Sequence, residues 1–180
     1  MCMGSWAQAV IFPQKKQPGV AKITQKANSY QLANKVLKAS FINTGGKLYF
    51  NGCSELGLQP DTELFKVLLG DGSTVAASGM KLEDVKIVTL GEDPSAATAS
   101  LRYAGKALEA RFTYGDLSIT WRAVLRDGSH YLRTEMDIKA ARDLSMKGIV
   151  AMNYLVAKNS AYTAPEVVGN TRGAILASNH

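Results

Sequence analysis

Residues 107–139 read ALEARFTYGDLSITWRAVLRDGSHYLRTEMDIK, and this stretch decides the fold. Apolar and polar side chains alternate along it in three consecutive runs, separated by Gly115-Asp116 and Asp127-Gly128. A period of two is that of a β-strand with one buried face. A Gly/Asp pair between two such runs favours a tight hairpin turn. The stretch therefore predicts a β-meander of three antiparallel strands.

Two-residue turns at both reversals would fix the register of this meander. The facing pairs would be Ala110 with Trp121, Phe112 with Ile119, Trp121 with Thr134, and Ile119 with Met136. All of these residues lie on one face, which is consistent with a single buried side. We therefore expect Trp121 in the core of the sheet, although an exposed tryptophan could serve as a stacking platform for a sugar.

The opposite side of the meander carries charged residues, and we call it the ionic face. Its members are Glu109, Arg111, Arg122, Arg133 and Glu135, with Tyr131 and Arg126 near its end. The same register sets Arg122 between Glu109 and Arg133, where flanking acids would relieve the repulsion between two arginines. Such a face can be an ordinary solvated surface with weak ion pairs. It can also hydrogen-bond sugar hydroxyls or dock another domain, because guanidinium and carboxylate groups form several directed bonds.

The rest of the chain favours further short strands separated by turn residues, which is typical of a β-sandwich or barrel. The expected strands are residues 21–26, 36–42, 47–51, 64–69, 74–78 and 85–90. Gly45-Gly46 and Asp71-Gly72 indicate hairpins, and residues 91–94 indicate a loop. No segment carries a helical stripe. We predict an all-β fold, an antiparallel β-sandwich forming one domain over residues 20–180.

The N-terminal residues have features of an export signal. Ala7-Gln8-Ala9 has the A-x-A form of a signal-peptidase site, although the charged start and the long apolar stretch of a full signal are missing. We interpret residues 1–9 as the remnant of such a signal, with a disordered N-terminus as the alternative. Residues 10–19, which include the polar segment PQKKQPG, are expected to be an exposed lead-in. The expected location is secreted or periplasmic.

Composition limits the possible partners. The chain has a formal net charge of +6 and a pI near 9.3, but its lysines are scattered from Lys15 to Lys158. A nucleic-acid footprint would show them clustered. No apolar run approaches the ~18 residues of a membrane-spanning helix. Two cysteines and two histidines are too few for a disulfide framework or a zinc site. We expect no cofactor, no nucleic acid and no membrane span.

Catalytic motifs are absent from the sequence. It has no G-x-S-x-G, no phosphate-binding glycine loop and no H-E-x-x-H. Glu109 and Glu135 could form a glycosidase pair, but an arginine beside each should keep it ionised. His130 has no sequence-level partner. We predict no catalytic residue, with a stand-alone glycosidase or epimerase using Glu109, Glu135 or His130 as the alternative.

Two strings, WRAVLRDGSHYLR at 121–133 and VVGNTRG at 167–173, carry a resemblance. The chain resembles the galactose-mutarotase-like β-supersandwich domain that precedes the catalytic barrel in secreted bacterial glycoside hydrolases of the endo-α-N-acetylgalactosaminidase and α-galactosidase-like kinds. Such domains usually run longer, so we expect a piece of a longer enzyme. The acid/base pair of mutarotase does not map onto this chain.

The resemblance implies a supersandwich fold, an extracytoplasmic location and a carbohydrate-processing context. It leads us to expect a non-catalytic accessory domain that supports the catalytic domain of a glycoside hydrolase and contacts glycan. Its partner would be carbohydrate or the adjoining catalytic domain. The binding residues we expect are Arg122, Arg133, Glu135, Glu109, Arg111 and Tyr131.

Overall fold

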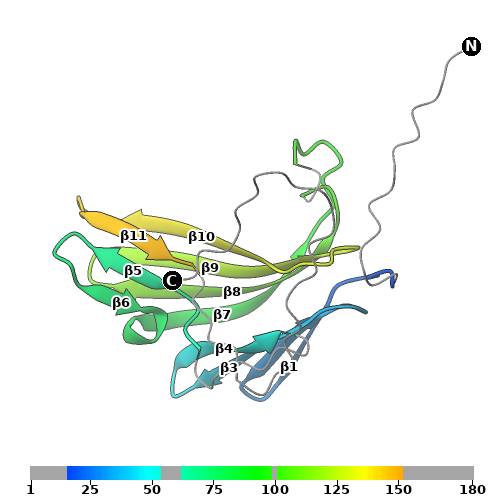
Figure 1. The fold of residues 1–180 in the computed structure, drawn as a ribbon, viewed down its shortest axis with the longest axis horizontal. Helices are drawn as coiled ribbons and strands as arrows, with labels where there is room; N and C mark the ends of the chain where they lie inside the picture. Colours follow the sequence, from blue (N-terminus) through cyan, green and yellow to red (C-terminus); the bar gives the residue numbers. More distant parts are fainter. Residues whose placement is uncertain (1–15, 54–61, 99–100, 152–180) are drawn as a thin grey trace, which may run out of the picture.

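The computed structural model describes residues 16–53, 62–98 and 101–151. Apart from one short 3₁₀ turn at Ala77–Gly79, its regular elements are strands, and every pairing between them is antiparallel (Figure 1). The strands are β1 (Lys22–Lys26), β2 (Ser29–Ala33), β3 (Lys38–Thr44), β4 (Lys47–Cys53), β5 (Lys66–Leu69), β6 (Thr74–Ala76), β7 (Lys81–Leu90), β8 (Gly105–Tyr114), β9 (Leu117–Arg126), β10 (Arg133–Ala140) and β11 (Met146–Val150). The predicted all-β antiparallel fold is confirmed.

The described strands form three sheets. Their orders are β1-β2-β3-β4, β10-β9-β8-β7 and β11-β5-β6. The first two are meanders, in which each strand pairs with its neighbour in sequence. The third joins β11 to β5, two strands from distant parts of the chain, and Figure 1 shows it at one end of the β7–β10 sheet. The β8–β9–β10 meander expected from the sequence is therefore present and gains β7 at its edge.

All three sheets share one hydrophobic core. The ring of Phe41 on β3 meets Trp121 on β9 edge-on, with centroids 5.6 Å apart. Phe65, just before β5, meets Phe112 on β8 in the same way at 5.3 Å. The β1–β4 sheet and the β5–β6 region thus cover the same face of the β7–β10 sheet. This is a sandwich, and Trp121, only 2% exposed, lies inside it as expected.

Two of the tight turns have the geometry that the sequence indicates. Thr44 pairs with Lys47 across Gly45-Gly46, and both glycines have positive φ, 60° and 72°. Tyr114 pairs with Leu117 across a two-residue turn that starts with Gly115 at φ 56°. Such turns match the twist of paired strands, and glycine adopts their left-handed backbone without strain.

The strand predictions differed from the structure in several places, and β7 begins at Lys81 instead of residue 85. Strand β2 was missed because Tyr30 and Leu32 are its only large apolar residues, and β11 was missed because it is short and bulged next to Gly148. The segment predicted as a strand over 74–78 leaves the sheet after Ala76 and becomes the 3₁₀ turn. The Asp71-Gly72 hairpin exists, but Leu69 donates to the carbonyl of Ser73, so its loop is longer than two residues.

The domain's hydrogen bonding begins within the expected lead-in. Residues 16 and 17 are exposed, but Pro18 is buried and its carbonyl accepts a hydrogen bond from the Lys35 amide at 2.9 Å. Gly19 follows with φ 71°, against the aliphatic stem of Lys35. The expected signal remnant at residues 1–9 and the string at 167–173 lie outside the described residues.

Candidate functional site

The ionic face is the side of the β7–β10 sheet that points away from the core. One row of facing residues crosses all four strands in the order Lys86, Glu109, Arg122 and Glu135. Charges alternate along this row, and side chains that face each other across neighbouring strands lie close enough to interact. The sequence had indicated Glu109, Arg122 and Glu135 on this face. The structure brings them into a single row and adds Lys86.

Glu109 is the centre of the row. Its Oε1 lies 2.9 Å from Lys86 Nζ and its Oε2 accepts a hydrogen bond from Arg122 Nε at 2.5 Å. The side chain is only 8% exposed. Burial alone would raise the pKa of Glu109, but the hydrogen bonds from Lys86 and Arg122 outweigh it and hold the pKa below the ordinary value. Glu109 is therefore a carboxylate at neutral pH, with both oxygens engaged.

The second half of the ionic face corrects the predicted register. Arg122 faces Glu135, not Arg133, and Arg133 instead faces Val124. Trp121 likewise faces Met136 rather than Thr134, and Ile119 faces Ile138 rather than Met136. The shift is two residues, so every side chain stays on the face expected of it. Arg133 remains on the ionic face and donates from Nη2 to Glu135 Oε1 at 2.5 Å.

The cause of this shift is the connection between β9 and β10. It is not a two-residue turn but spans residues 127–132, and it is bound to the N-terminal segment. Asp127 Oδ1 accepts a hydrogen bond from the Ala21 amide at 2.7 Å, and the Gly128 amide donates to the Gly19 carbonyl at 2.9 Å. The side-chain amide of Asn34 (Nδ2) also donates to the Ser129 carbonyl. We call these three bonds the tether.

The remaining candidates lie at the margin of the ionic face. Arg111 on β8 has a side chain 56% exposed, and its nearest acid is Asp84, 3.7 Å away on β7. Tyr131 lies in the 127–132 connection and is 56% exposed. Arg126 is used internally, because it donates to the carbonyls of Gly91 and Tyr103. Because Tyr131 lies in the connection and not on a strand, it is outside the row of ion-paired residues.

Lys86 is the residue of the ionic face that sequence reasoning missed. The strand over 85–90 was expected, but a loop of more than ten residues separates β7 from β8, so no local turn signal indicated that they pair. Period-two alternation alone could have placed Lys86 on one side of its strand. It could not have chosen Glu109 as the partner.

The geometry of the two glutamates argues against glycosidase chemistry. Glu109 and Glu135 lie two strands apart, about 10 Å between backbones, with Arg122 between them. A glycosidase needs one protonated carboxyl as general acid, and Glu109 is held ionised. Among the described residues, no group of three or more His, Cys, Asp and Glu could hold a metal ion. The part of the chain that the structure describes also has no helix long and apolar enough to cross a bilayer.

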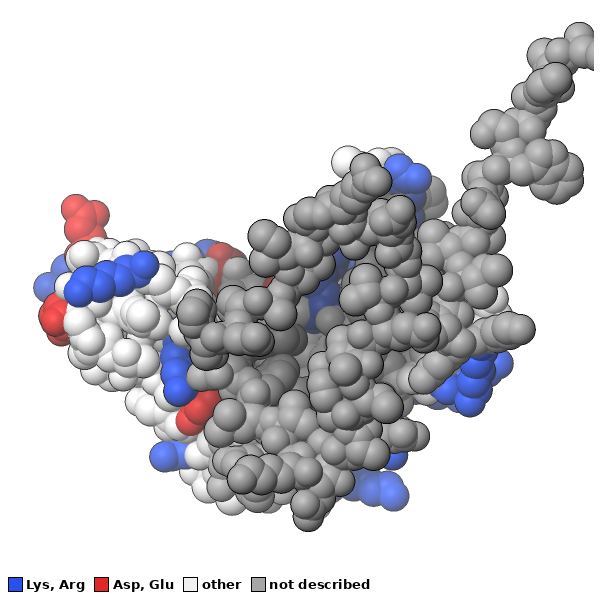
Figure 2. Space-filling model, viewed as in Figure 1, with Lys and Arg blue, Asp and Glu red and all other residues white. Residues whose placement is uncertain are grey.

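The described basic residues of one face do not form a single patch. Figure 2 shows the described lysines and arginines of this face at several separate places. This matches the scatter of lysines along the sequence. A nucleic-acid interface would require a continuous basic stripe.

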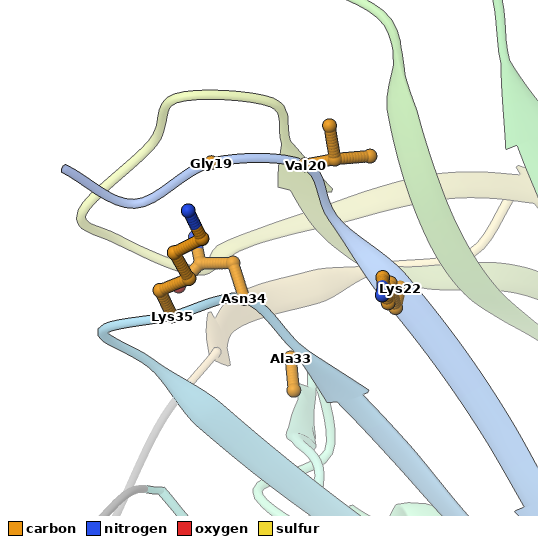
Figure 3. Close-up of a pocket in the computed structure, with 6 residues that line it drawn as sticks. All are labelled: Gly19, Val20, Lys22, Ala33, Asn34 and Lys35. Atoms are coloured by element: carbon orange, nitrogen blue, oxygen red, sulfur yellow. The ribbon is translucent and has the colours of Figure 1, made fainter.

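A cavity of about 430 Å³ lies beside the tether, between Gly19-Val20 and the turn that follows β2 (Figure 3). Lys22 and Lys35 contribute the charges of its lining. Asn34 also lines it, but the Asn34 side chain is already bonded to Ser129 and to the amides of residues 36 and 37. The Asn34 side chain is therefore already engaged in hydrogen bonds within the protein.

The described residues thus define a class, an antiparallel β-sandwich with an ion-paired outer face. Comparisons with protein-family models, with curated proteins and with solved structures found no match.

Proposed function

We propose that this chain is a non-catalytic accessory domain of a secreted glycoside hydrolase, and that its ionic face contacts carbohydrate next to the catalytic domain. The resemblance over residues 121–133 supports the context. The structure supplies an independent argument, which is the state of Arg122.

Arg122 is held by one edge only. Its Nε donates to Glu109, and the side chain is 34% exposed. Within the described residues its two terminal nitrogens make no hydrogen bond. A guanidinium fixed at Nε still has four N–H donors on a rigid plane. Sugar hydroxyls accept such bonds. The exposed side chain of Arg122, with donors left at its two terminal nitrogens, is therefore the observation that carries the proposal.

Isothermal titration against mucin-type and α-galactoside oligosaccharides tests the proposal. We expect millimolar binding, which is weakened about tenfold or more in Arg122→Ala because charge-assisted hydrogen bonds are lost. Arg142→Ala is the matched control, since Arg142 is an exposed arginine that pairs with Asp116 at the β8–β9 turn. No heat at millimolar sugar would remove the glycan contact and leave a supporting role toward the catalytic domain.

The alternative, a stand-alone sugar-active enzyme, has one observation in its favour. Glu135 is about a third exposed, so it can be reached by a substrate. A screen with aryl glycosides tests it. Turnover that disappears in Glu135→Gln would favour the enzyme, and turnover that is absent or unchanged removes Glu135 as a catalytic residue.

A further inference from the structure

A second cavity lies where the β1–β4 sheet meets the free edge of the β7–β10 sheet. It measures about 330 Å³ and is lined by residues from β2, from β3 and its turn, and from β7. The lining residues are Tyr30, Asn43, Gly46, Leu82, Glu83, Asp84 and Val85. Ligand cavities begin near this size, so it has room for about one sugar ring.

Strand β7 contributes an irregular piece of backbone to this cavity. Its register with β8 shifts between Leu82 and Asp84, which leaves Glu83 as the extra residue of a bulge. Among the described strands, β7 is at the edge of its sheet, so none of them pairs with its outward amides and carbonyls. Bulges on an edge re-aim side chains and are common beside binding sites.

Tyr30 is the residue that points to a ligand. It lies on the core side of β2 and is only 8% exposed, yet it lines the cavity. Its hydroxyl is not one of the fully buried polar atoms that lack a partner, so it remains accessible to solvent. A hydroxyl of a molecule in the cavity would take the place of the water that meets it there.

The charges around the cavity select a neutral ligand. Glu83 is paired with Lys81 at 3.0 Å and accepts a hydrogen bond from Thr113, and Asp84 lies 3.7 Å from Arg111. Each carboxylate thus has a cation beside it, so the lining has no unbalanced charge that would attract an ion. What remains is a set of acceptors and donors suited to hydroxyl groups.

We infer that this cavity, which we call the Tyr30 cavity, is a binding site for one neutral polyhydroxylated ring, such as a terminal hexose. The inference extends the proposed function by adding a site on β2, β3 and β7, strands other than the one that carries Arg122. It predicts that the domain holds a glycan end in the Tyr30 cavity independently of the ionic face.

The test uses the whole chain labelled with ¹⁵N and titrated with methyl α-galactoside, with amide shifts as the readout. We expect shifts to concentrate at residues 30, 43, 46 and 82–85. Tyr30→Phe should weaken binding about three- to tenfold, the effect of one lost hydrogen bond. The substitution keeps the ring that packs in the core, so the urea midpoint serves as the check of folding. Tyr114→Phe, in an exposed tyrosine at the end of β8, is the matched control.

The outcomes separate the two proposals. Shifts confined to the ionic face, abolished by Arg122→Ala and untouched by Tyr30→Phe, overturn the Tyr30 cavity and leave the proposed function standing. Shifts at the Tyr30 cavity that survive Arg122→Ala support the cavity alone. Absence of any shift at millimolar methyl α-galactoside overturns the cavity.

Discussion

The two faces of the β7–β10 sheet are built by the same four strands but respond differently to their register. On the core face, a two-residue shift exchanges Thr134 for Met136 opposite Trp121 and leaves Trp121 on the buried side. On the ionic face, the same two-residue shift changes the residue that faces Arg122 from Arg133 to Glu135. Apolar packing thus tolerates an even shift, whereas ion pairing depends on every row.

The largest effect should come from the core face. Phe112 is 1% exposed and packs edge-on against Phe65, so Phe112→Ala should lower the free energy of unfolding by about 3–5 kcal/mol. Urea denaturation measures it. Tyr114→Ala is the control on the same strand and side, since Tyr114 is 45% exposed. Equal losses for the two variants would mean that the packing against Phe65 contributes nothing.

A smaller loss is expected at the centre of the ionic face. Glu109→Ala leaves Lys86 and Arg122 without their shared acceptor, but both are partly exposed and can be hydrated again. We expect a loss of about 1–3 kcal/mol in the free energy of unfolding. A loss as large as that of Phe112→Ala would mean that the two faces are equally sensitive, contrary to the comparison.

Acid should weaken the ionic face through the same residue. The pKa of Glu109 in the folded protein lies below its ordinary value of 4.5, so its stabilisation is complete above that value. It is lost as the pH falls below 4.5 and through the folded pKa. The urea midpoint of the wild type should therefore fall more steeply between pH 5 and pH 3 than that of Glu109→Gln. Parallel profiles would contradict the assignment, because the other carboxyls are common to both proteins.

The smallest effect is expected at the margin of the ionic face. Arg111 is 56% exposed and lies 3.7 Å from Asp84, so Arg111→Ala should change the free energy of unfolding by about 0.5 kcal/mol or less. The same urea titration measures it. A loss above that of Glu109→Ala would show that exposed pairs, rather than the Glu109 cluster, stabilise this side of the sheet.

The sequence predicted the parts of the fold that depend on neighbours along the chain. The turn at Gly115-Asp116 involves only the hairpin it joins, so the pairs Ala110–Trp121 and Glu109–Arg122 were obtained correctly. The reversal after β9 has the same kind of dipeptide and does form a turn, in which the Ser129 amide donates to the Arg126 carbonyl. However, Asp127 also bonds to Ala21, and the chain re-enters the sheet only at Arg133. No local pattern reveals a partner 106 positions away.

The candidate sites show the same limit. The faces on which Arg122, Arg133 and Glu135 lie followed from alternation, but their pairing did not. Lys86 and the Tyr30 cavity depend on β7 meeting β8 and the β1–β4 sheet, which involves long-range contacts. Sequence periodicity predicts on which side of a strand a residue lies, but it does not predict the residue that it faces on the next strand.

The tether also has a consequence for synthesis of the chain. Strands β1 to β4 form a meander of near neighbours, so they can pair soon after they leave the ribosome. The carbonyl of Gly19 and the amide of Ala21 gain their partners only when residues 127 and 128 have emerged. Until then, the apolar side of the β1–β4 sheet has no β7–β10 sheet to cover it. The apolar side of the β1–β4 sheet is therefore exposed during part of the synthesis. We expect chaperones to bind the nascent chain most strongly at this stage.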